Sequence, residues 1–353
     1  MADAAANPAP PAPPAAKRVG IRDIARTAGV STATVSMVLN DNPKISDATR
    51  EKVRAEIDRS GYQPNRIAQS LSGKYTRVIG ILLPELRHTL ADPYFGEVIS
   101  GVCDRAAQLG HKVTLESARP AYVRERKHLE LFERRFVDGV LCIGFDDRHD
   151  FLGDFGAAGF PVLVVNNRFD DLRADTVLCD YAAGAERAMA HLDQLGHRRI
   201  GMLYGSRDVS TARVMIDAFE RKHHAFDPSL LEQGRFSEEH GQAAAGVLLD
   251  RHPDLTALFC GNDKMALGAI RELHDRGLRV PEDVSVIGFD DLPYARFVTP
   301  ALSTVHLPFY EVGDLACERL VERIRGRRKP VDETLPTRLV LRESTARATP
   351  RRR

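Results

Sequence analysis

Residues 21–40 read IRDIARTAGVSTATVSMVLN. Apolar side chains in the first half of this stretch recur at the spacing of one helix face, and Gly29 suits the left-handed conformation that ends a helix. Ser31 is a good N-cap for a second helix, whose buried stripe includes Val35. A third helix is expected within residues 46–61, with Val53 facing inward and Gly61 at its end. Two short helices joined by a three-residue turn that contains glycine predict a helix-turn-helix.

The charge is divided unevenly along the chain, although the net charge is only +1. Residues 17–77 carry a net +6, residues 78–321 carry −11 and residues 322–353 carry +7. A small basic module before a large acidic body favours an anionic partner for the module, and nucleic acid is the usual one. A generic three-helix bundle with a randomly biased surface remains the alternative interpretation.

The second helix is the expected reader of DNA, because in a helix-turn-helix it enters the major groove with its early residues on base edges. Hydroxyls and methyl groups on its outward face can contact bases, whereas Asn40 is better placed for phosphates. Segment 63–74 predicts a short helix, either a linker that forms only on DNA or an ordinary connector. The candidate DNA-binding residues from these two segments are Thr32, Ala33, Thr34, Ser36, Met37, Asn40, Asn65 and Arg66.

The remainder of the chain alternates apolar, strand-like runs with amphipathic, helix-like stretches. The runs are 77–84, 112–115, 139–143, 161–165, 177–179, 200–204, 258–261, 284–289 and 304–307, and the stretches lie near 95–109, 123–136, 181–195, 211–223, 238–250, 263–276 and 309–325. Such alternation predicts parallel sheets covered by helices on both faces. The number of units exceeds one ordinary open sheet, so two Rossmann-like subdomains are expected. The fold class is therefore a small all-α helix-turn-helix domain followed by an α/β body.

The ends of these strands supply the candidate ligand site, because ligands of such sheets bind beyond the carboxyl ends of the strands. Asn166, Asn167 and Arg168 follow one strand, residues 261–263 follow another, and Asp290 follows a third. Asp92 and two aromatic rings also stand before the first body helix. Amide, carboxylate, guanidinium and aromatic groups together suit a small polar ligand. The alternative is that the aspartates in these loops are only helix caps and loop residues.

Several motifs resemble the lactose-repressor (LacI/GalR) family of bacterial transcription regulators. They are VSTATVSxVLN, TREKV, GYQPNRIAQSL and IGILLP in the first part, and DPYFxEVIxG, GNDxMALGAI and LRVPEDVSVIGFDD in the body. The resemblance implies a body similar to periplasmic sugar-binding proteins, with an effector in the cleft between two subdomains. It also implies that Leu71 enters the minor groove from a hinge helix, as an apolar wedge.

The resemblance places ligand positions on the body. They fall on Asn166, Phe236, Asn262 and Asp290, with Tyr94 and Phe95 near the mouth of the cleft. Arg168, from its place after a strand, and Arg213 complete the candidate effector-binding residues. Two positions depart from the family. Met215 stands where a ligand-binding arginine is frequent, so a simple sugar effector is in doubt, and Arg213 is two residues away. Met37 stands where the family often has a polar or basic base reader, so the operator sequence is in doubt as well.

The domain boundaries expected from these patterns are as follows. A Pro/Ala-rich disordered tail covers 1–17, the helix-turn-helix 18–64, the hinge helix and linker 65–76, the body 77–346 and a basic tail 347–353. Within the body, the N-subdomain takes about 77–178 and 309–336, and the C-subdomain about 179–308 and 337–346.

Composition limits the class of protein. Five scattered cysteines without a C-x-x-C pair argue against a disulfide scaffold or zinc ribbon and fit a reducing cytosol. No apolar run is long enough for a membrane span, and the first residues do not form a signal peptide, so a cytoplasmic protein is expected. No catalytic, phosphate-loop or metal motif is recognisable, so no enzyme activity, cofactor or metal is expected.

The leading hypothesis is therefore a repressor that binds a palindromic operator as a homodimer, because one short recognition helix buries too little surface for a specific site. A small-molecule effector would change its operator affinity. A solute-binding protein of a transport system is the main alternative, and a metabolic enzyme with a Rossmann-like body is a third.

Overall fold

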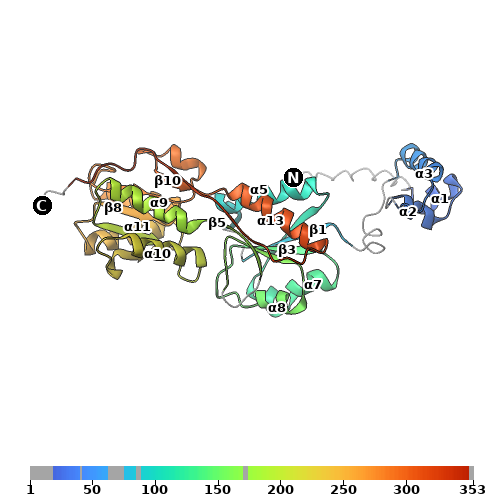
Figure 1. The fold of residues 1–353 in the computed structure, drawn as a ribbon, viewed down its shortest axis with the longest axis horizontal. Coiled ribbons are helices and arrows are strands. Elements are labelled where there is room, and N and C mark those ends of the chain that lie inside the picture. The colour runs from blue at the N-terminus through green and yellow to red at the C-terminus, as the bar shows by residue number, and fades with distance from the viewer. Residues whose placement is uncertain (1–18, 40–41, 63–74, 85–88, 170–173, 350–353) are drawn as a thin grey trace, which may run out of the picture. The chain divides into compact units, whose positions relative to one another are not determined.

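The computed structural model describes residues 19–39, 42–62, 75–84, 89–169 and 174–349. The chain forms two compact units, residues 1–75 and 76–353, and each is described by itself. Within the described residues, the first contains helices only, and the second contains three sheets with their covering helices (Figure 1).

The first unit is a three-helix bundle of α1 (Ile21–Ala28), α2 (Thr32–Leu39) and α3 (Asp47–Ser60). Gly29 ends α1 with a φ of 63°, and Gly61 ends α3 with a φ of 62°, as their positions predicted. The Ser31 hydroxyl accepts a hydrogen bond from the Thr34 amide at 3.0 Å, so it caps α2. The helices enclose a small core that is completed by the buried ring of Tyr62.

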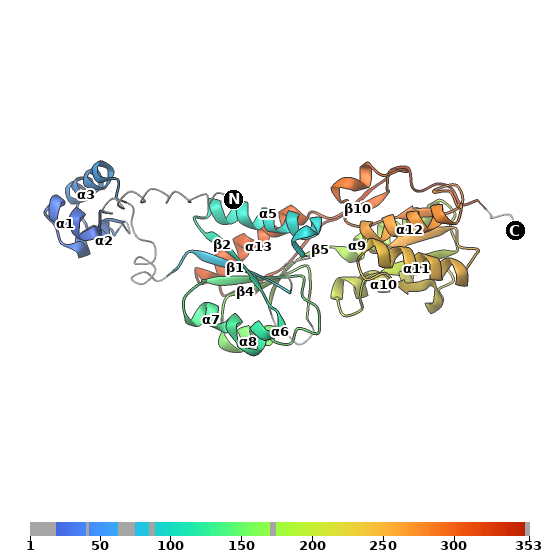
Figure 2. The same cartoon turned by 180° about the vertical axis from the view of Figure 1, so that it is seen from behind.

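Six parallel strands form the first sheet of the second unit, in the order β11-β5-β4-β3-β1-β2. Helices α5 (Pro93–Gln108) and α13 (Phe309–Ile324) cover one face, and α6 (Pro120–Arg124), α7 (Lys127–Glu133) and α8 (Leu152–Ala158) cover the other (Figure 2). The strands are β1 (Val78–Leu83), β2 (Lys112–Ser117), β3 (Gly139–Ile143), β4 (Val162–Val165), β5 (Asp175–Cys179) and β11 (Asp332–Leu335), and a 3-10 turn spans Thr89–Ala91.

Four parallel strands form the second sheet, in the order β7-β6-β8-β9. Helices α9 (Tyr181–Gln194) and α10 (Ser210–Lys222) lie on one face, and α11 (Glu238–Arg251) and α12 (Asp263–Asp275) lie on the other. The strands are β6 (Ile200–Tyr204), β7 (Leu231–Gln233), β8 (Ala257–Cys260) and β9 (Ser285–Ile287), with 3-10 turns at Pro228–Leu230 and Pro293–Arg296.

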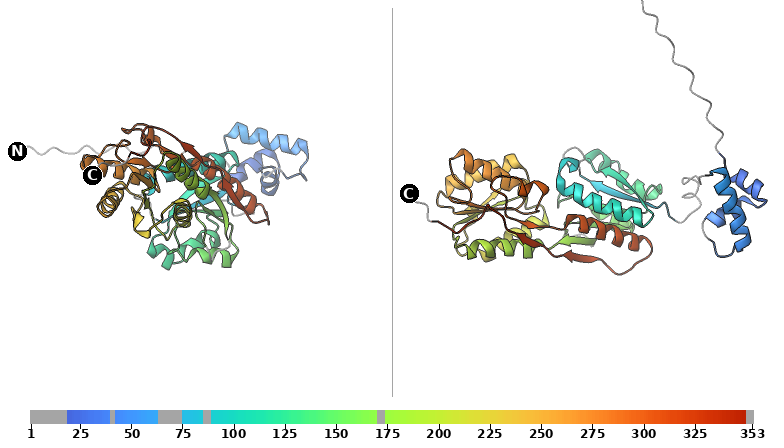
Figure 3. Two further views of the ribbon diagram at one scale, coloured as in Figure 1. Left: turned by 60° about the vertical axis from the view of Figure 1, so that its left-hand side comes forward. Right: turned by 90° about the horizontal axis from the view of Figure 1, so that it is seen from above.

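The chain passes between the two halves of this unit three times. It leaves the first sheet after β5, returns between β10 (Thr304–His306) and α13, and crosses again between β11 and β12 (Arg338–Val340). Strands β10 and β12 pair antiparallel in a sheet of their own beside the second sheet. Figure 3 shows these late segments running along both halves. The sequence patterns predicted β10 but missed β7, β11, β12 and α8, and they merged α6 and α7 into one helix.

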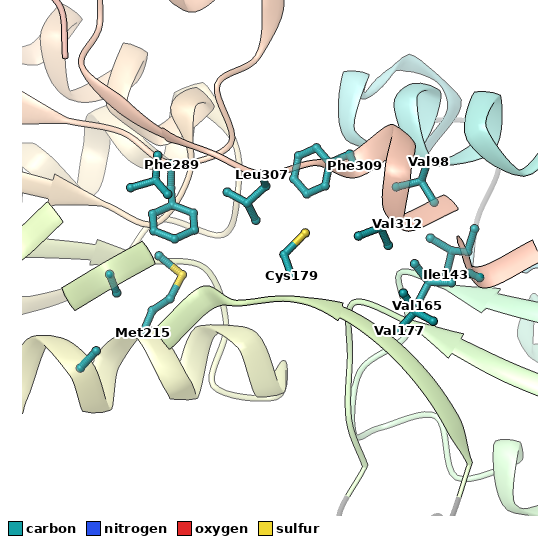
Figure 4. Close-up of a cluster of buried hydrophobic side chains, with 14 of the residues drawn as sticks. Val98, Ile143, Val165, Val177, Cys179, Met215, Phe289, Leu307, Phe309 and Val312 are labelled. Carbon is teal, nitrogen blue, oxygen red and sulfur yellow. The ribbon is translucent and has the colours of Figure 1, made fainter. Parts of the chain in front are cut away.

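One hydrophobic core runs through both halves of the second unit. Figure 4 shows Cys179, at the end of β5, between Met215 and Phe289 of the second half and Val177 and Val312 of the first. The two halves are therefore joined by buried side chains at the crossings, while the polar ends of their strands remain free to form a site.

Candidate functional site

A cavity of about 220 Å³ lies between the two halves of the second unit, beyond the carboxyl ends of strands from both sheets. This is where parallel α/β sheets bind ligands. Six of the eight predicted effector residues line the cavity: Tyr94, Phe95, Asn166, Phe236, Asn262 and Asp290.

The two predicted arginines do not line the cavity. Arg168 pairs with Asp332, and its main-chain amide donates to Ser210 Oγ at 2.9 Å. Arg213 forms an ion pair with Asp147 and also donates to the main-chain oxygen of Arg207 at 2.8 Å. Met215, in contrast, is buried and does line the cavity. Arg213 therefore does not replace the arginine that the family resemblance expects at residue 215.

Most of the amide side chains at the cavity are already used within the protein. Asn262 caps α12, because its Oδ1 accepts from the Met265 amide at 2.8 Å, and its Nδ2 donates to the Phe236 carbonyl at 3.4 Å. Asn166 Oδ1 accepts from the Cys179 amide at 2.8 Å. Its Nδ2 is buried and has no hydrogen-bond partner among the described residues. Asn166 therefore keeps one donor for a ligand.

Asp290 and Asp263 are neighbouring carboxylates with different surroundings. Asp263 is fully buried, and it accepts from Thr304 Oγ1 at 2.6 Å and from the Leu292 amide at 2.8 Å. The carboxylate of Asp290 lines the cavity and has no hydrogen-bond donor among the described residues. Burial, together with the charges of Asp263 and Asp92, raises the pKa of Asp290, and Lys264 opposes that rise. Asp263 thus holds the scaffold, whereas Asp290 is open to a ligand.

The backbone is strained at three of the cavity residues. Asn166, Phe236 and Asp290 have φ values of 51°, 61° and 118°, which side-chain-bearing residues rarely adopt. Such conformations persist only when the surrounding structure enforces them, and they gather at binding sites. Phe236 also requires Gly205, because a Cβ there would lie 1.9 Å from its ring. The local backbone therefore places the Phe236 ring in the cavity wall.

Polar contacts join the two halves on either side of the cavity. On one side, Lys264 of α12 pairs with Asp92, the N-cap of α5, at 3.1 Å. On the other side, Asn167 Oδ1 accepts from the Ser210 amide of α10 at 3.0 Å. The sequence patterns singled out Asp92 and Asn167 but missed Lys264 and Ser210. Their only signal was that both stand in the first turn of an amphipathic helix after a strand.

The outward face of α2 carries the predicted DNA-reading side chains of the first unit. Thr32 and Ala33 are exposed, and Ser36 and Met37 are half-buried. The Thr34 hydroxyl lies 2.9 Å from Ser31 Oγ, so it takes part in the helix cap. The remaining candidates, Asn40, Asn65, Arg66 and Leu71, lie outside the described residues.

Within the part of the chain that the structure describes, no group of three or more metal-binding side chains comes together. No helix in that part is both long enough and apolar enough to cross a membrane.

Comparison with known proteins agrees with both units. The family model "Bacterial regulatory proteins, lacI family" matches residues 20–65, and the model "Periplasmic binding protein-like domain" matches residues 189–345. The HTH-type transcriptional regulator DegA of Bacillus subtilis is 34% identical over 334 residues, which cover 92% of this chain and 98% of DegA. The chain belongs to the lacI family of bacterial regulatory proteins. The family resemblance seen in the sequence is thereby confirmed.

Other members of the family extend the comparison. The transcriptional repressor PurR of Haemophilus influenzae is 34% identical over 317 residues, covering 89% of this chain and 93% of PurR. The Lac repressor dimer bound to operator and the anti-inducer ONPF superposes with a TM-score of 0.81 at 29% identity, covering 94% of this chain and all of that one. The CelR–cellobiose complex has a TM-score of 0.72 at 30% identity and covers 93% of this chain and all of that one.

Proposed function

We propose that this lacI-family protein is a transcriptional repressor that binds a palindromic operator as a homodimer and changes its operator affinity when a small molecule occupies the cavity. The observation that carries the proposal is that one chain combines a capped helix α2 with exposed early residues and, in its second unit, a cavity large enough for a small ligand. Among solved relatives, the Lac repressor dimer holds operator and an anti-inducer together, which supports both parts.

The two polar bridges beside the cavity suggest how a ligand acts. Each bridge joins one half of the body to the other, so their distances depend on how far the halves are closed. A ligand that contacts both halves favours the closed arrangement, and the change in population is set by its difference in affinity for the two states. We assign the ligand contacts to the six lining residues that the sequence also identified. We assign Arg213 to a structural ion pair with Asp147 outside the cavity lining.

The competing interpretations have less support. A solute-binding protein of a transport system finds no support among the relatives, which are transcriptional regulators. We also expect no enzymatic activity, because the described lining holds no histidine, lysine, serine or cysteine that could form an acid–base or nucleophile pair with Asp290.

Selection from a random duplex library tests the proposal. The full-length chain should enrich one inverted repeat, and binding to it should weaken steeply with salt, because Lys and Arg contacts displace counterions from phosphates. Enrichment of a site without two-fold symmetry would contradict the dimer. Failure to enrich any sequence would contradict the repressor.

A further inference from the structure

The charges at the cavity are acidic, and this limits the ligand. Among the described residues that line it, the charged side chains are Asp92 and Asp290, and there is no lysine or arginine. Lys264 already neutralises Asp92 at 3.1 Å. Asp290 has no such partner. An anionic ligand would meet repulsion here, whereas a cationic group would supply the missing counter-charge to Asp290.

The hydrogen bonds already made at the cavity restrict the class of ligand independently of charge. Both polar atoms of the Asn167 side chain already have partners. Its Nδ2 donates to the Phe145 carbonyl at 2.7 Å, and its Oδ1 accepts from the Ser210 amide at 3.0 Å. Asn262 is used in the same way by its helix cap and the Phe236 carbonyl. The described lining also holds four hydroxyl groups, which belong to Tyr94, Tyr181, Tyr204 and Thr211. Its other free polar side-chain groups are the Asp290 carboxylate and the buried Asn166 Nδ2. A ligand that uses both of these groups needs a donor toward Asp290 and an acceptor toward Asn166.

Aromatic rings occupy much of the remaining wall. The Tyr94 ring lies with its centroid 4.7 Å from that of Phe95 and 4.7 Å from that of Phe309. Tyr181 and Phe236 also line the cavity. Aromatic faces attract organic cations by their quadrupoles, and they shield the apolar body of a ligand from water. A carboxylate beside such rings is a combination suited to a protonated amine.

We infer that the effector is a small organic amine, with its cationic nitrogen at Asp290, an apolar body against the aromatic rings and one acceptor atom at Asn166 Nδ2. This inference rests on the proposed function only in calling the ligand an effector, because the binding geometry itself does not involve DNA. It also explains Met215, since an amine with an apolar body needs no arginine on that wall.

Three probes that share one ring and differ in charge test the inference on the full-length chain without DNA. They are 2-phenylethylamine, 2-phenylethanol and 3-phenylpropionate. Calorimetry should give an affinity for the amine about 10-fold or more above that of the alcohol and the acid. Asp290→Asn should remove this preference. The matched control Asp208→Asn loses the same charge outside the cavity lining and should bind the amine as the wild type does.

Several outcomes would overturn the inference. They are tighter binding of the alcohol or the acid, equal binding of the amine by Asp290→Asn, and no binding of the amine at millimolar concentration. A failed DNA selection together with amine binding lost in Asp290→Asn would reject the repressor and leave the amine site standing. Successful selection without amine binding would reject the amine site and leave the repressor standing.

A second readout needs no ligand. On the cavity side, the titratable groups around Asp290 are Asp92, Tyr94, Cys179, Tyr181, Asp263, Lys264 and Tyr294. Asp290 also lines a second pocket, where the charged or titratable groups are Glu97, Asp291, Arg296, His306, Tyr310, Glu311 and Arg342. The pKa of Asp290 is higher in the folded protein than in the unfolded chain. The free energy of unfolding therefore falls as the pH rises from the unfolded-state pKa toward the folded-state pKa. Asp290→Asn should therefore melt higher than the wild type at about pH 8, by a larger margin than at about pH 5. An equal or lower melting temperature at both pH values would mean that Asp290 already has its counter-charge.

Discussion

The three-helix unit and the cavity of the body position their candidate binding residues in different ways. The unit presents candidate contact residues on the outside of one helix, and its buried side chains only hold three helices together. The cavity gathers its residues from strand ends in both halves, strains the backbone at Asn166, Phe236 and Asp290, and leaves a carboxylate without a donor. The candidate DNA-contacting surface therefore depends on one local sequence motif, whereas the enclosed cavity depends on contacts between segments that are distant in sequence.

The first prediction tests whether the two units are independent. Val35 is fully buried in the small core of the first unit, so Val35→Asp places an unpaired charge there at a cost of roughly 3–5 kcal/mol. We expect this unit to unfold and DNA binding to fall by ~100-fold or more. Ligand binding by the body should stay at the wild-type level in calorimetry. The control Val35→Ile keeps the apolar contact and should retain DNA binding. Equal losses at both sites would show that the units fold as one.

The second prediction separates scaffold from site within the cavity. Asp263→Ala leaves the Thr304 hydroxyl and the Leu292 amide without their acceptor, so it should lower the free energy of unfolding by about 1–3 kcal/mol. Asp290→Ala removes a carboxylate that has no donor, so its effect on stability at neutral pH should be smaller or stabilising. Denaturant titration of the two variants measures the difference. Equal destabilisation would show that Asp290 is also a structural residue.

The helix-turn-helix was predictable because its signals are local. Gly29, Ser31 and Gly61 have the conformations that their positions imply, and Val35 and Val53 are buried as the helical spacing indicates. The apolar strands of the two parallel sheets were also recognisable, because strands buried on both faces read as continuous apolar runs.

The missed elements and residues depend on distant contacts. β11 reads DETL, and its exposed, polar positions give no apolar run, yet it pairs with β5 along the edge of the first sheet. Arg168 and Arg213 had suitable chemistry close to strand ends, but nearby carboxylates at Asp332 and Asp147 hold them elsewhere. Lys264 stood out only by its place in the first turn of a helix, and nothing in the sequence pointed to its distant partner Asp92. Strand ends thus indicated the region of the site but not which side chains are free within it.

The central claim is that one molecule in the cavity changes the affinity of the chain for its operator. The most direct test is the operator Kd, measured by fluorescence anisotropy on the selected duplex, with and without a saturating concentration of the amine that calorimetry shows to be bound. The account predicts a change of about 5-fold or more in the wild type, in line with ordinary allosteric coupling, and no change in Asp290→Asn. The same operator Kd for the free and the amine-bound wild type would contradict it.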